Sequence, residues 1–152
     1  MMDDVRISRA ERADLPELLA LLAEVDLPHE GVEEHLEGFM AARDARGRLI
    51  GAIGLERHGS VGLLRSAAVS PDAQGGGLGL RLTSELLEAA RADGVEEVVL
   101  LTTTARDFFG CKFGFEVSGR DAYEGALARS PEWNLPRCSS AVLMRLGLGG
   151  AS

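Results

Sequence analysis

The sequence has few cysteines, few aromatic residues and no long uncharged apolar run, and each scarcity excludes a class of protein. Two cysteines, Cys111 and Cys138, are too few to staple a secreted scaffold of 152 residues and fit a reduced, cytoplasmic protein. The longest apolar segments are short and broken by charge, so we expect no membrane span. The first five residues lack the basic start and apolar core of a signal peptide.

Basic residues are also in short supply. The chain has 16 Lys and Arg against 24 Asp and Glu, which gives a formal net charge of -8. An acidic surface repels phosphate backbones, so we expect no nucleic-acid partner, although a small basic patch can still hold an anionic cofactor. The His, Cys, Asp and Glu residues do not have the spacing of zinc ligands, and no metal site is expected.

The remaining composition is that of one globular domain. Hydrophobic residues make up 45% of the chain, and its length suffices for a core without disulfide or metal staples. We expect a single domain over residues 1–147. Residues 148–152 are rich in small residues and are expected to form a frayed tail.

Apolar periodicity predicts the order of the elements. Helices are expected from Asp14, where Glu17 would complete a capping box, to residue 25, and over residues 30–37, 78–94 and 105–112. Alternating or continuous apolar runs predict strands over residues 5–8, 39–43, 48–56, 61–70, 95–101, 115–117 and 141–146. This order is typical of an α+β (mixed α/β) fold, with a central mixed sheet of six to seven strands flanked by about four helices.

The segment over residues 69–79 carries the chemistry. A buried strand ends, Pro71 turns the chain, and glycines at 75, 76, 77 and 79 precede a helix. Bare backbone N–H groups and the positive end of the helix dipole form a cradle for an anion such as a pyrophosphate. A glycine-rich surface turn is the alternative. The segment lacks Gly-x-x-x-x-Gly-Lys-Ser/Thr and Gly-x-Gly-x-x-Gly, which excludes a P-loop and disfavours a dinucleotide-binding βαβ unit.

These residues resemble a known motif. Gln74-x-x-Gly77-x-Gly79, after Val69-x-Pro71, resembles the acyl-CoA pyrophosphate motif of the GNAT superfamily of acetyl-CoA-dependent N-acetyltransferases, and the element order is similar over nearly the whole chain. Further short stretches resemble the arsenic-resistance N-acetyltransferase branch, and the Leu-Thr-Thr stretch is also similar to the acetyltransferase domain of N-acetylglutamate synthases. The stretches are Leu63-Leu64-Arg65-Ser66, Leu100 to Ala105, Phe108-Phe109, Gly114-Phe115 and Ser140-Ala141.

The resemblance implies a GNAT-like acyl-CoA N-acyltransferase fold and a binding mode for acetyl-CoA. The co-substrate would lie where the parallel strands over residues 63–69 and 98–103 splay apart, with its pantetheine arm along the backbone of Ala67, Ala68 and Val69. Backbone N–H near Val69 would stabilise the oxyanion. The pyrophosphate would meet N–H groups of Gln74, Gly75, Gly76, Gly77, Leu78 and Gly79. Thr103, Phe108 and Phe109 would lie near the thioester or the pantetheine, with core packing as the alternative for both aromatic rings.

The acid and the base of the reaction remain unassigned. Many members of the superfamily have a tyrosine where this chain has Phe109 and Gly110, and its one tyrosine lies outside that motif. The thiolate of CoA can leave unaided, because its pKa is close to that of cysteine. Glu56, acting through water, and His58 are the candidates for the base, and solvated surface and loop positions are their alternatives.

Arg65 interrupts an apolar strand beside the expected thioester. Together with Ser66 it is a candidate for binding the substrate, because a guanidinium can hold a carboxylate, phosphinate or arsinate in a two-pronged grip. The alternative is a buried ion pair with an Asp or Glu. The segment around Trp133 is expected to cover part of the cleft.

The sequence thus predicts an acetyl-CoA-dependent N-acetyltransferase acting on the amino group of a small amino-acid-like substrate. The arsenic-resistance resemblance implies an arsenic- or phosphorus-containing amino acid and a role in resistance. The alternatives are a peptide or protein N-acetyltransferase and a non-catalytic acyl-CoA-binding or regulatory module. The resemblance also implies a homodimer.

Overall fold

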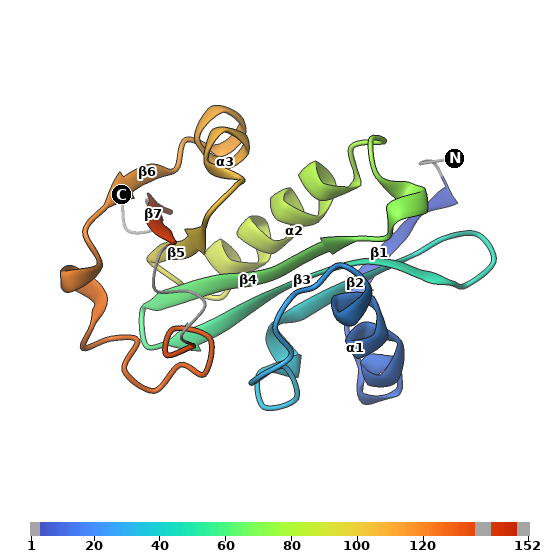
Figure 1. The fold of residues 1–152 in the computed structure, drawn as a ribbon, viewed down its shortest axis with the longest axis horizontal. Coiled ribbons are helices and arrows are strands. Elements are labelled where there is room, and N and C mark those ends of the chain that lie inside the picture. Colours follow the sequence, from blue (N-terminus) through green and yellow to red (C-terminus); the bar gives the residue numbers. More distant parts are fainter. Residues whose placement is uncertain (1–3, 136–140, 149–152) are drawn as a thin grey trace.

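The computed structural model describes residues 4–135 and 141–148, which form one seven-stranded sheet in the order β1-β2-β3-β4-β5-β7-β6 (Figure 1). The strands are β1 (Arg6–Arg9), β2 (Phe39–Arg43), β3 (Leu49–His58), β4 (Val61–Val69), β5 (Glu97–Thr102), β6 (Glu116–Ser118) and β7 (Val142–Gly147). The α-helices in this part of the chain are α1 (Leu15–Glu24), α2 (Leu78–Ala92) and α3 (Arg106–Phe113). The predicted mixed sheet is confirmed.

The sheet is mixed because β4 and β5 run parallel, whereas its other neighbouring strands are antiparallel. Helix α2 makes the crossover between the two parallel strands, as such a connection requires. The loop before α2 therefore lies at the carboxyl end of β4, and α3 follows the carboxyl end of β5. The glycine-rich loop and helix α3, which both belong to the expected site, therefore lie at the same end of the sheet.

The predicted helix over residues 30–37 does not form. Turns occupy most of that segment, followed by the short 3-10 helix η3 (Leu36–Gly38). Gly31 has a φ of 83°, and a Cβ there would lie 2.7 Å from Pro131. The carbonyls of Pro28 and Glu30 accept hydrogen bonds from Arg65 instead of helical N–H groups. A buried guanidinium thus decides the backbone of this segment.

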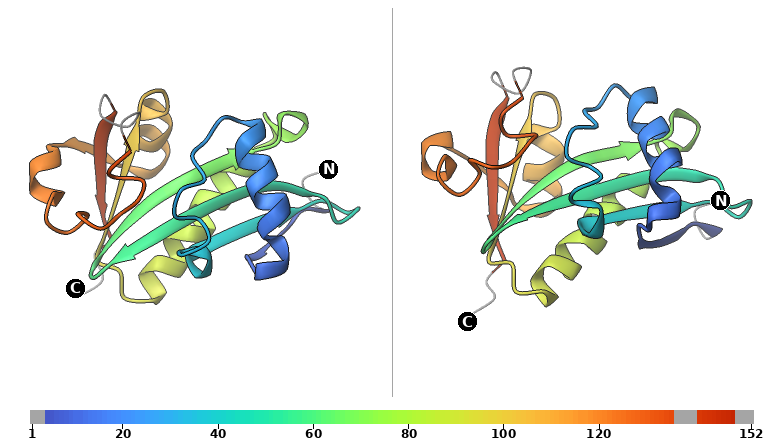
Figure 2. Two further views of the ribbon diagram at one scale, coloured as in Figure 1. Left: turned by 60° about the horizontal axis from the view of Figure 1, so that its bottom comes forward. Right: turned by 90° about the horizontal axis from the view of Figure 1, so that it is seen from below.

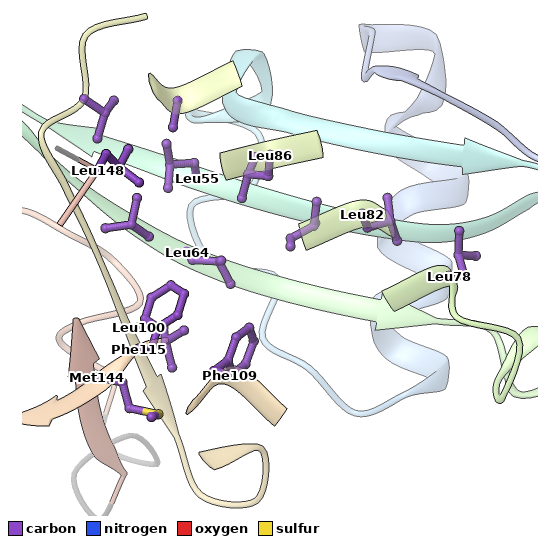
Figure 3. Close-up of a cluster of buried hydrophobic side chains, with 14 of the residues drawn as sticks. Leu55, Leu64, Leu78, Leu82, Leu86, Leu100, Phe109, Phe115, Met144 and Leu148 are labelled. Carbon is purple, nitrogen blue, oxygen red and sulfur yellow. The ribbon is translucent and has the colours of Figure 1, made fainter. Parts of the chain in front are cut away.

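Helices α1 and α2 cover opposite faces of the sheet (Figure 2). On α2, apolar side chains four residues apart are buried against β3 and β4; Figure 3 shows the leucines of this row beside Leu55 and Leu64. On the other face, Leu18 and Leu22 of α1 pack with Phe39 of β2. The spacing that predicted each helix therefore also predicted the face that it buries.

Two expectations at the ends of elements are corrected. Asp14 precedes α1, but the predicted capping box does not form, because Asp14 and Glu17 both accept hydrogen bonds from Arg43. Leu148 is not frayed: its side chain is buried in the core, and its N–H donates to the Glu96 carbonyl at 2.9 Å. Residues 149–152 of the predicted tail, and Ser140 and Cys138, lie outside the described residues.

A third apolar cluster holds the C-terminal segment against the sheet. Tyr123, Leu127 and Trp133 pack on Leu63 of β4 and Val99 of β5. Trp133 is buried, and the guanidinium of Arg120 lies 4.8 Å from its ring centroid. This packing places residues 130–133 on the α1 face, beside the point where β4 and β5 separate.

Candidate active site

The strands β4 and β5 separate part-way along their length. Their ladder covers only Val61–Leu64 and Glu97–Leu100, although β4 continues to Val69. In Figure 2, β5 and β7 lie close to β4 at one end of the sheet and move away from it towards the other end. The predicted splay between these two parallel strands is therefore present, and the backbone of β4 beyond Leu64 is outside the ladder with β5.

A β-bulge lies at the point of separation. On β3 the register passes from Ala52, opposite Ala68, to Gly54, opposite Arg65, so Ser66 and Ala67 face a single residue. Ser66 has a φ of 59°, which is a left-handed conformation that non-glycine residues rarely adopt. Bulges bend the strand that carries them and are frequent beside active sites. The bulge thus contributes to turning β4 away from β5.

The first of two cavities fills the gap between the separated strands. It has a volume of about 240 Å³, and we call it the splay cavity. Backbone and side chains of both strands form most of its wall, with contributions from Leu27 and Glu132 on the α1 side and Phe109 of α3. The polar residues in the described wall are Arg65, Ser66, Thr102, Thr103, Thr104 and Glu132. Three predicted residues, Arg65, Ser66 and Thr103, are thus brought together with Ala67 and Phe109.

The second cavity lies in front of the glycine-rich loop. It has a volume of about 410 Å³ and is lined by the end of β4, the loop, the first turn of α2, and two side chains of α3. We call it the loop cavity. Its lining residues are Val69, Ala73, Gln74, Gly75, Gly77, Leu78, Gly79, Leu80, Phe108 and Lys112. Ala68 and Gly76, also predicted, do not line it, and the side chain of Ala68 is buried on the α1 face.

The loop cavity fits an anion that is held by backbone N–H groups. Gly77 is the N-cap of α2 with a φ of 84°, and no side chain caps the helix. Apart from the adjacent residues and the backbone of α2 itself, Cβ atoms built at Gly77 and Gly79 would have no atom within 4 Å. The first-turn N–H groups of a helix have no intrahelical acceptor, and the helix dipole adds positive potential there. Small residues therefore leave open the approach to these donors.

Two side chains set the polarity of the loop cavity. The amide of Gln74 donates to the Val69 carbonyl at 3.0 Å, so this side chain closes the loop onto β4. Lys112 brings a cation to the opposite wall. Sequence reasoning missed Lys112, although it lies four residues after Phe108 and hence on the same face of α3. That spacing was the available signal.

Arg65 and Glu56 form a buried ion pair. Both side chains are 0% exposed, and Arg65 Nη1 lies 2.8 Å from Glu56 Oε2. The same guanidinium donates to Ser66 Oγ at 3.0 Å and to the carbonyls of Pro28 and Glu30. Of the two accounts that the sequence left open for Arg65, the ion pair is present. A grip on a substrate anion would require one of these bonds to be exchanged.

Glu56 is saturated with donors and does not line either cavity. Its Oε1 accepts from Ser130 Oγ at 2.5 Å and from His58 Nε2 at 3.0 Å. Burial alone raises the pKa of this carboxyl, but the hydrogen bonds from Ser130, His58 and Arg65 outweigh burial and hold the pKa below its usual value. The expectation that Glu56 acts as a base through water is not supported by this geometry.

His58, the other candidate for the base, is also bonded within this cluster and lines neither cavity. It lies at the end of β3, bonded to Glu56, and its ring centroid is 5.6 Å from that of His35. Ligand atoms of His35, Glu56 and His58 lie within 4.8 Å of one another. Both oxygens of Glu56 already accept hydrogen bonds, so we assign this cluster to the stability of the β3–β4 hairpin.

Tyr123 does not replace the missing tyrosine. Its hydroxyl donates to Glu97 and accepts from Arg145 Nε at 3.1 Å, and it lines neither cavity. Burial, and then the hydrogen bond to Glu97, raise the pKa of this phenol. Phe109, which stands where many members of the superfamily have a tyrosine, packs on Phe115 with ring centroids 5.6 Å apart (Figure 3). Phe109 therefore packs in the core and also lines the splay cavity, and its place near the thioester or the pantetheine stays a prediction.

Comparison with known proteins gives the class and the family. The model of the acetyltransferase (GNAT) family matches residues 6–115. An amino-acid acetyltransferase of Neisseria meningitidis serogroup A is 30% identical over 126 residues, which cover 77% of this chain and 28% of that protein. The chain thus belongs to the acetyltransferase (GNAT) family, because the family model covers well over half of it.

Solved structures agree with this assignment. N-acetylglutamate synthase from Neisseria gonorrhoeae, complexed with coenzyme A and L-arginine, has a TM-score of 0.74 at 27% identity, over 95% of this chain and 33% of that one. Rv2747 from Mycobacterium tuberculosis shares the fold, with a TM-score of 0.76 at 21% identity over 93% of this chain and 98% of that one. The chain spans about 28% of the curated relative's length and 33% of the synthase's.

The similarity to N-acetylglutamate synthases is confirmed, whereas the arsenic-resistance branch stays a prediction. A separate observation concerns membranes: within residues 4–135 and 141–148, each helix is too short or too polar to span a bilayer.

Proposed function

We propose that this chain transfers the acetyl group of acetyl-CoA to the amino group of a free amino acid or a small amino-acid-like acceptor. One observation carries the proposal: Ala67 lines the splay cavity, and Val69, two residues further along β4, lines the loop cavity. A donor lying along β4 would therefore have its phosphates in the loop cavity and its thioester between the strands. The coenzyme A complex of the synthase supports this choice of donor.

Each part of the donor has a matching surface. The β4 edge beyond Leu64, released from β5, offers backbone groups to the pantetheine amides over residues 67–69. The first turn of α2 offers N–H groups to the pyrophosphate, and Lys112 offers a charge. Phe108 supplies an apolar wall between them. Donor binding thus rests on backbone at most positions, which explains why small residues dominate the loop.

The reaction needs a neutral amine, donors for the oxyanion and a leaving thiolate. In our proposal the amine attacks the thioester carbonyl as the C–N bond forms, backbone N–H groups near Val69 stabilise the oxyanion, and the C–S bond then breaks. The thiolate leaves without a tyrosine, because a thiol with a pKa near that of cysteine is a good leaving group. It takes up a proton released by the amine.

The acceptor class is inferred from the relatives. They include amino-acid acetyltransferases and a synthase structure with coenzyme A and N-acetyl-glutamate, although this chain spans only a third of that synthase. An arsenic- or phosphorus-containing amino acid, in a resistance role, is the narrower acceptor class that we propose from the sequence. For these anionic acceptors, Arg65 would exchange a protein bond for an oxyanion of the substrate.

A second candidate is a non-catalytic acyl-CoA-binding or regulatory module. The observation that favours it is that the described walls of both cavities hold no tyrosine, histidine or cysteine. Peptide or protein N-acetylation is the other alternative. We also propose a cytoplasmic location, and a homodimer formed through an edge strand of the sheet, β1 or β6. Sedimentation equilibrium tests the homodimer.

The test begins with thermal unfolding in the presence of acetyl-CoA and of CoA. A ligand at 100 times its Kd adds about 2.7 kcal/mol of stability. Thiol release from acetyl-CoA is then measured with the common L-amino acids, with phosphinic and arsinic amino acids, and with peptides. Stabilisation with thiol release for a free amino acid supports the proposal. Stabilisation without release from any amine favours the binding module, and the absence of stabilisation refutes both.

A further inference from the structure

The hydroxyl of Ser66 is a buried hydrogen-bond donor in the wall of the splay cavity. The described wall has hydroxyl side chains on Ser66, Thr102, Thr103 and Thr104. Ser66 is 5% exposed, whereas the threonines are half-buried or exposed. Its Oγ accepts a hydrogen bond from Arg65 Nε at 3.0 Å, and among the described residues no acceptor takes its proton. The proton is therefore directed away from the guanidinium and is available to a ligand in the cavity.

The backbone holds Ser66 in a strained conformation. Its φ is 59°, in the left-handed region that residues with a Cβ rarely adopt. Ser66 and Ala67 form the bulge on β4, where two residues lie opposite one residue of β3. Strained residues of this kind cluster at active sites, where the surrounding structure maintains them. Here the strained residue is the one whose buried hydroxyl has a proton to donate.

A buried ion pair polarises the Ser66 hydroxyl. Arg65 Nη1 lies 2.8 Å from Glu56 Oε2, and both side chains are 0% exposed. Nε of the same guanidinium donates to Ser66, and the carbonyls of Pro28 and Glu30 accept its other hydrogen bonds. A hydroxyl that accepts from a cation becomes a stronger donor, because hydrogen bonds in series polarise one another. The same contacts fix the guanidinium, and hence the position of Ser66 Oγ.

The course of the donor along β4 brings its acetyl group to Ser66. In the proposed binding mode, the pyrophosphate lies in the loop cavity and the pantetheine arm runs back along β4 from Val69 to Ala67. The thioester ends this arm and therefore comes next to Ser66, the residue before Ala67. The carbonyl oxygen of the thioester gains negative charge during the reaction, so a fixed donor stabilises it most in the transition state.

We propose that the Ser66 hydroxyl donates a hydrogen bond to the acetyl carbonyl oxygen of acetyl-CoA and stabilises the oxyanion that forms there. The inference rests on the function proposed above. As the C–N bond forms, an electron pair moves to the carbonyl oxygen, where the Ser66 donor meets it. The carbonyl then re-forms, the C–S bond breaks, and the proton lost by the nitrogen goes to the thiolate. Ser66 keeps its own proton throughout and adds to the backbone N–H donors of β4.

The test compares Ser66→Ala and Ser66→Gly with a control variant, Leu86→Ala. Both Ser66 variants remove the donor and leave the Arg65 Nε–H without its acceptor. Glycine adopts a φ of 59° without strain, so Ser66→Gly should have a higher Tm than Ser66→Ala. Leu86 is buried on α2 and lines neither cavity, so Leu86→Ala should lower the Tm without changing the site. Stability and catalysis are thus varied separately.

Thiol release with the best acceptor among the common L-amino acids gives kcat and KM. Both Ser66 variants should lower kcat about 100-fold, as loss of one oxyanion donor does. The Kd for acetyl-CoA and the KM for the acceptor should stay unchanged, and Leu86→Ala should keep the wild-type kcat. Wild-type kcat in either Ser66 variant would overturn the assignment. A raised acceptor KM with unchanged kcat would also overturn it, because Ser66 would then bind the acceptor.

The carbonyl stretch of bound acetyl-CoA gives a readout that needs no acceptor. Infrared difference spectra are recorded with acetyl-CoA that is isotope-labelled at the acetyl carbonyl. A hydrogen bond lowers the stretching frequency, so the band should shift down on binding to wild type and return towards the free value in Ser66→Ala. Wild-type turnover with a band that Ser66→Ala does not move would overturn the Ser66 assignment alone. An inactive wild type that binds acetyl-CoA would overturn the proposed function, and the catalytic role of Ser66 with it.

Discussion

Replacing Glu56 by glutamine tests how much the buried ion pair contributes to the fold. The wild-type carboxylate is 0% exposed and accepts from Arg65 at 2.8 Å, Ser130 at 2.5 Å and His58 at 3.0 Å. Glutamine keeps the shape of the side chain but has one acceptor oxygen and no charge. Its amide group would therefore face at least one donor, and the guanidinium would stay buried without its counter-charge.

The burial of the pair sets the expected magnitude. Removing one partner of a buried ion pair costs about 3–5 kcal/mol, whereas an exposed pair contributes about 0–1 kcal/mol. Both side chains here are 0% exposed, so we expect the larger range for Glu56→Gln. Arg65→Met should cost at least as much, because it also leaves the carbonyls of Pro28 and Glu30 without their donor. The double variant should cost clearly less than the sum.

Urea unfolding measures these free energies, and the protein contains its own probe. Trp133 is the single tryptophan, it is 5% exposed, and its backbone N–H donates to Ser130, which in turn donates to Glu56. Its fluorescence therefore reports on the cluster itself. A cost below about 1 kcal/mol for Glu56→Gln, or additive costs in the double variant, would refute the reasoning.

The pH dependence of the free energy of unfolding tests the contribution of Glu56 independently. Hydrogen bonds from Ser130, His58 and Arg65 outweigh the effect of burial and lower the pKa of Glu56 in the folded state. A carboxyl with a lowered pKa binds fewer protons when folded than when unfolded. Its contribution to stability is therefore present above the unfolded-state pKa and is lost as the pH falls towards the folded-state pKa. Wild type should thus lose stability on acidification more steeply than Glu56→Gln, and parallel curves would contradict this.

Three further substitutions have defined outcomes. Lys112→Ala should weaken acetyl-CoA binding about 10-fold (roughly 1.4 kcal/mol by calorimetry) with an unchanged Tm, since Lys112 is exposed and lines the loop cavity; unchanged affinity would remove it from the site. Gly77→Ala should cost about 1–2 kcal/mol in urea unfolding, because its φ is 84°, and should weaken acetyl-CoA binding further; full affinity would contradict the cradle. Gly54→Ala should cost about 1–3 kcal/mol without affecting the Kd, because a Cβ there would lie 2.3 Å from the Phe39 ring, and a neutral result would show that the ring can move.

Local patterns predicted most elements of the fold. The four-residue spacing that begins at Leu78 predicted α2 and its buried face. The glycine-rich loop, for which the sequence predicts an anion cradle, lines a cavity in the structure. The prediction failed over residues 30–37, where the pattern allowed a helix. There the carbonyls of Pro28 and Glu30 serve Arg65, a contact that no local spacing encodes.

In the candidate site, too, some residues had a local signal in the sequence and others were placed only by tertiary contacts. Arg65 was singled out because a charge interrupts an apolar strand, and that signal is local. Its partner Glu56 is nine residues away on the neighbouring strand and had the profile of a solvated strand end. Glu132 had no signal at all, since it reaches the splay cavity only because Trp133 anchors its segment on Leu63 and Val99.

The sequence by itself therefore determined the features that depend on residues close together along the chain. These are the buried faces of the helices, the alternation of the strands and the exposed backbone of the glycine-rich loop. The tertiary structure alone decided where β4 leaves β5, because this depends on a bulge whose residues Ser66 and Ala67 are defined only by their register with β3. It also decided which carboxylate meets the splay. Both residues are buried glutamates, but Glu56 is bonded to Arg65, Ser130 and His58 and lines neither cavity, whereas Glu132 lines the splay cavity.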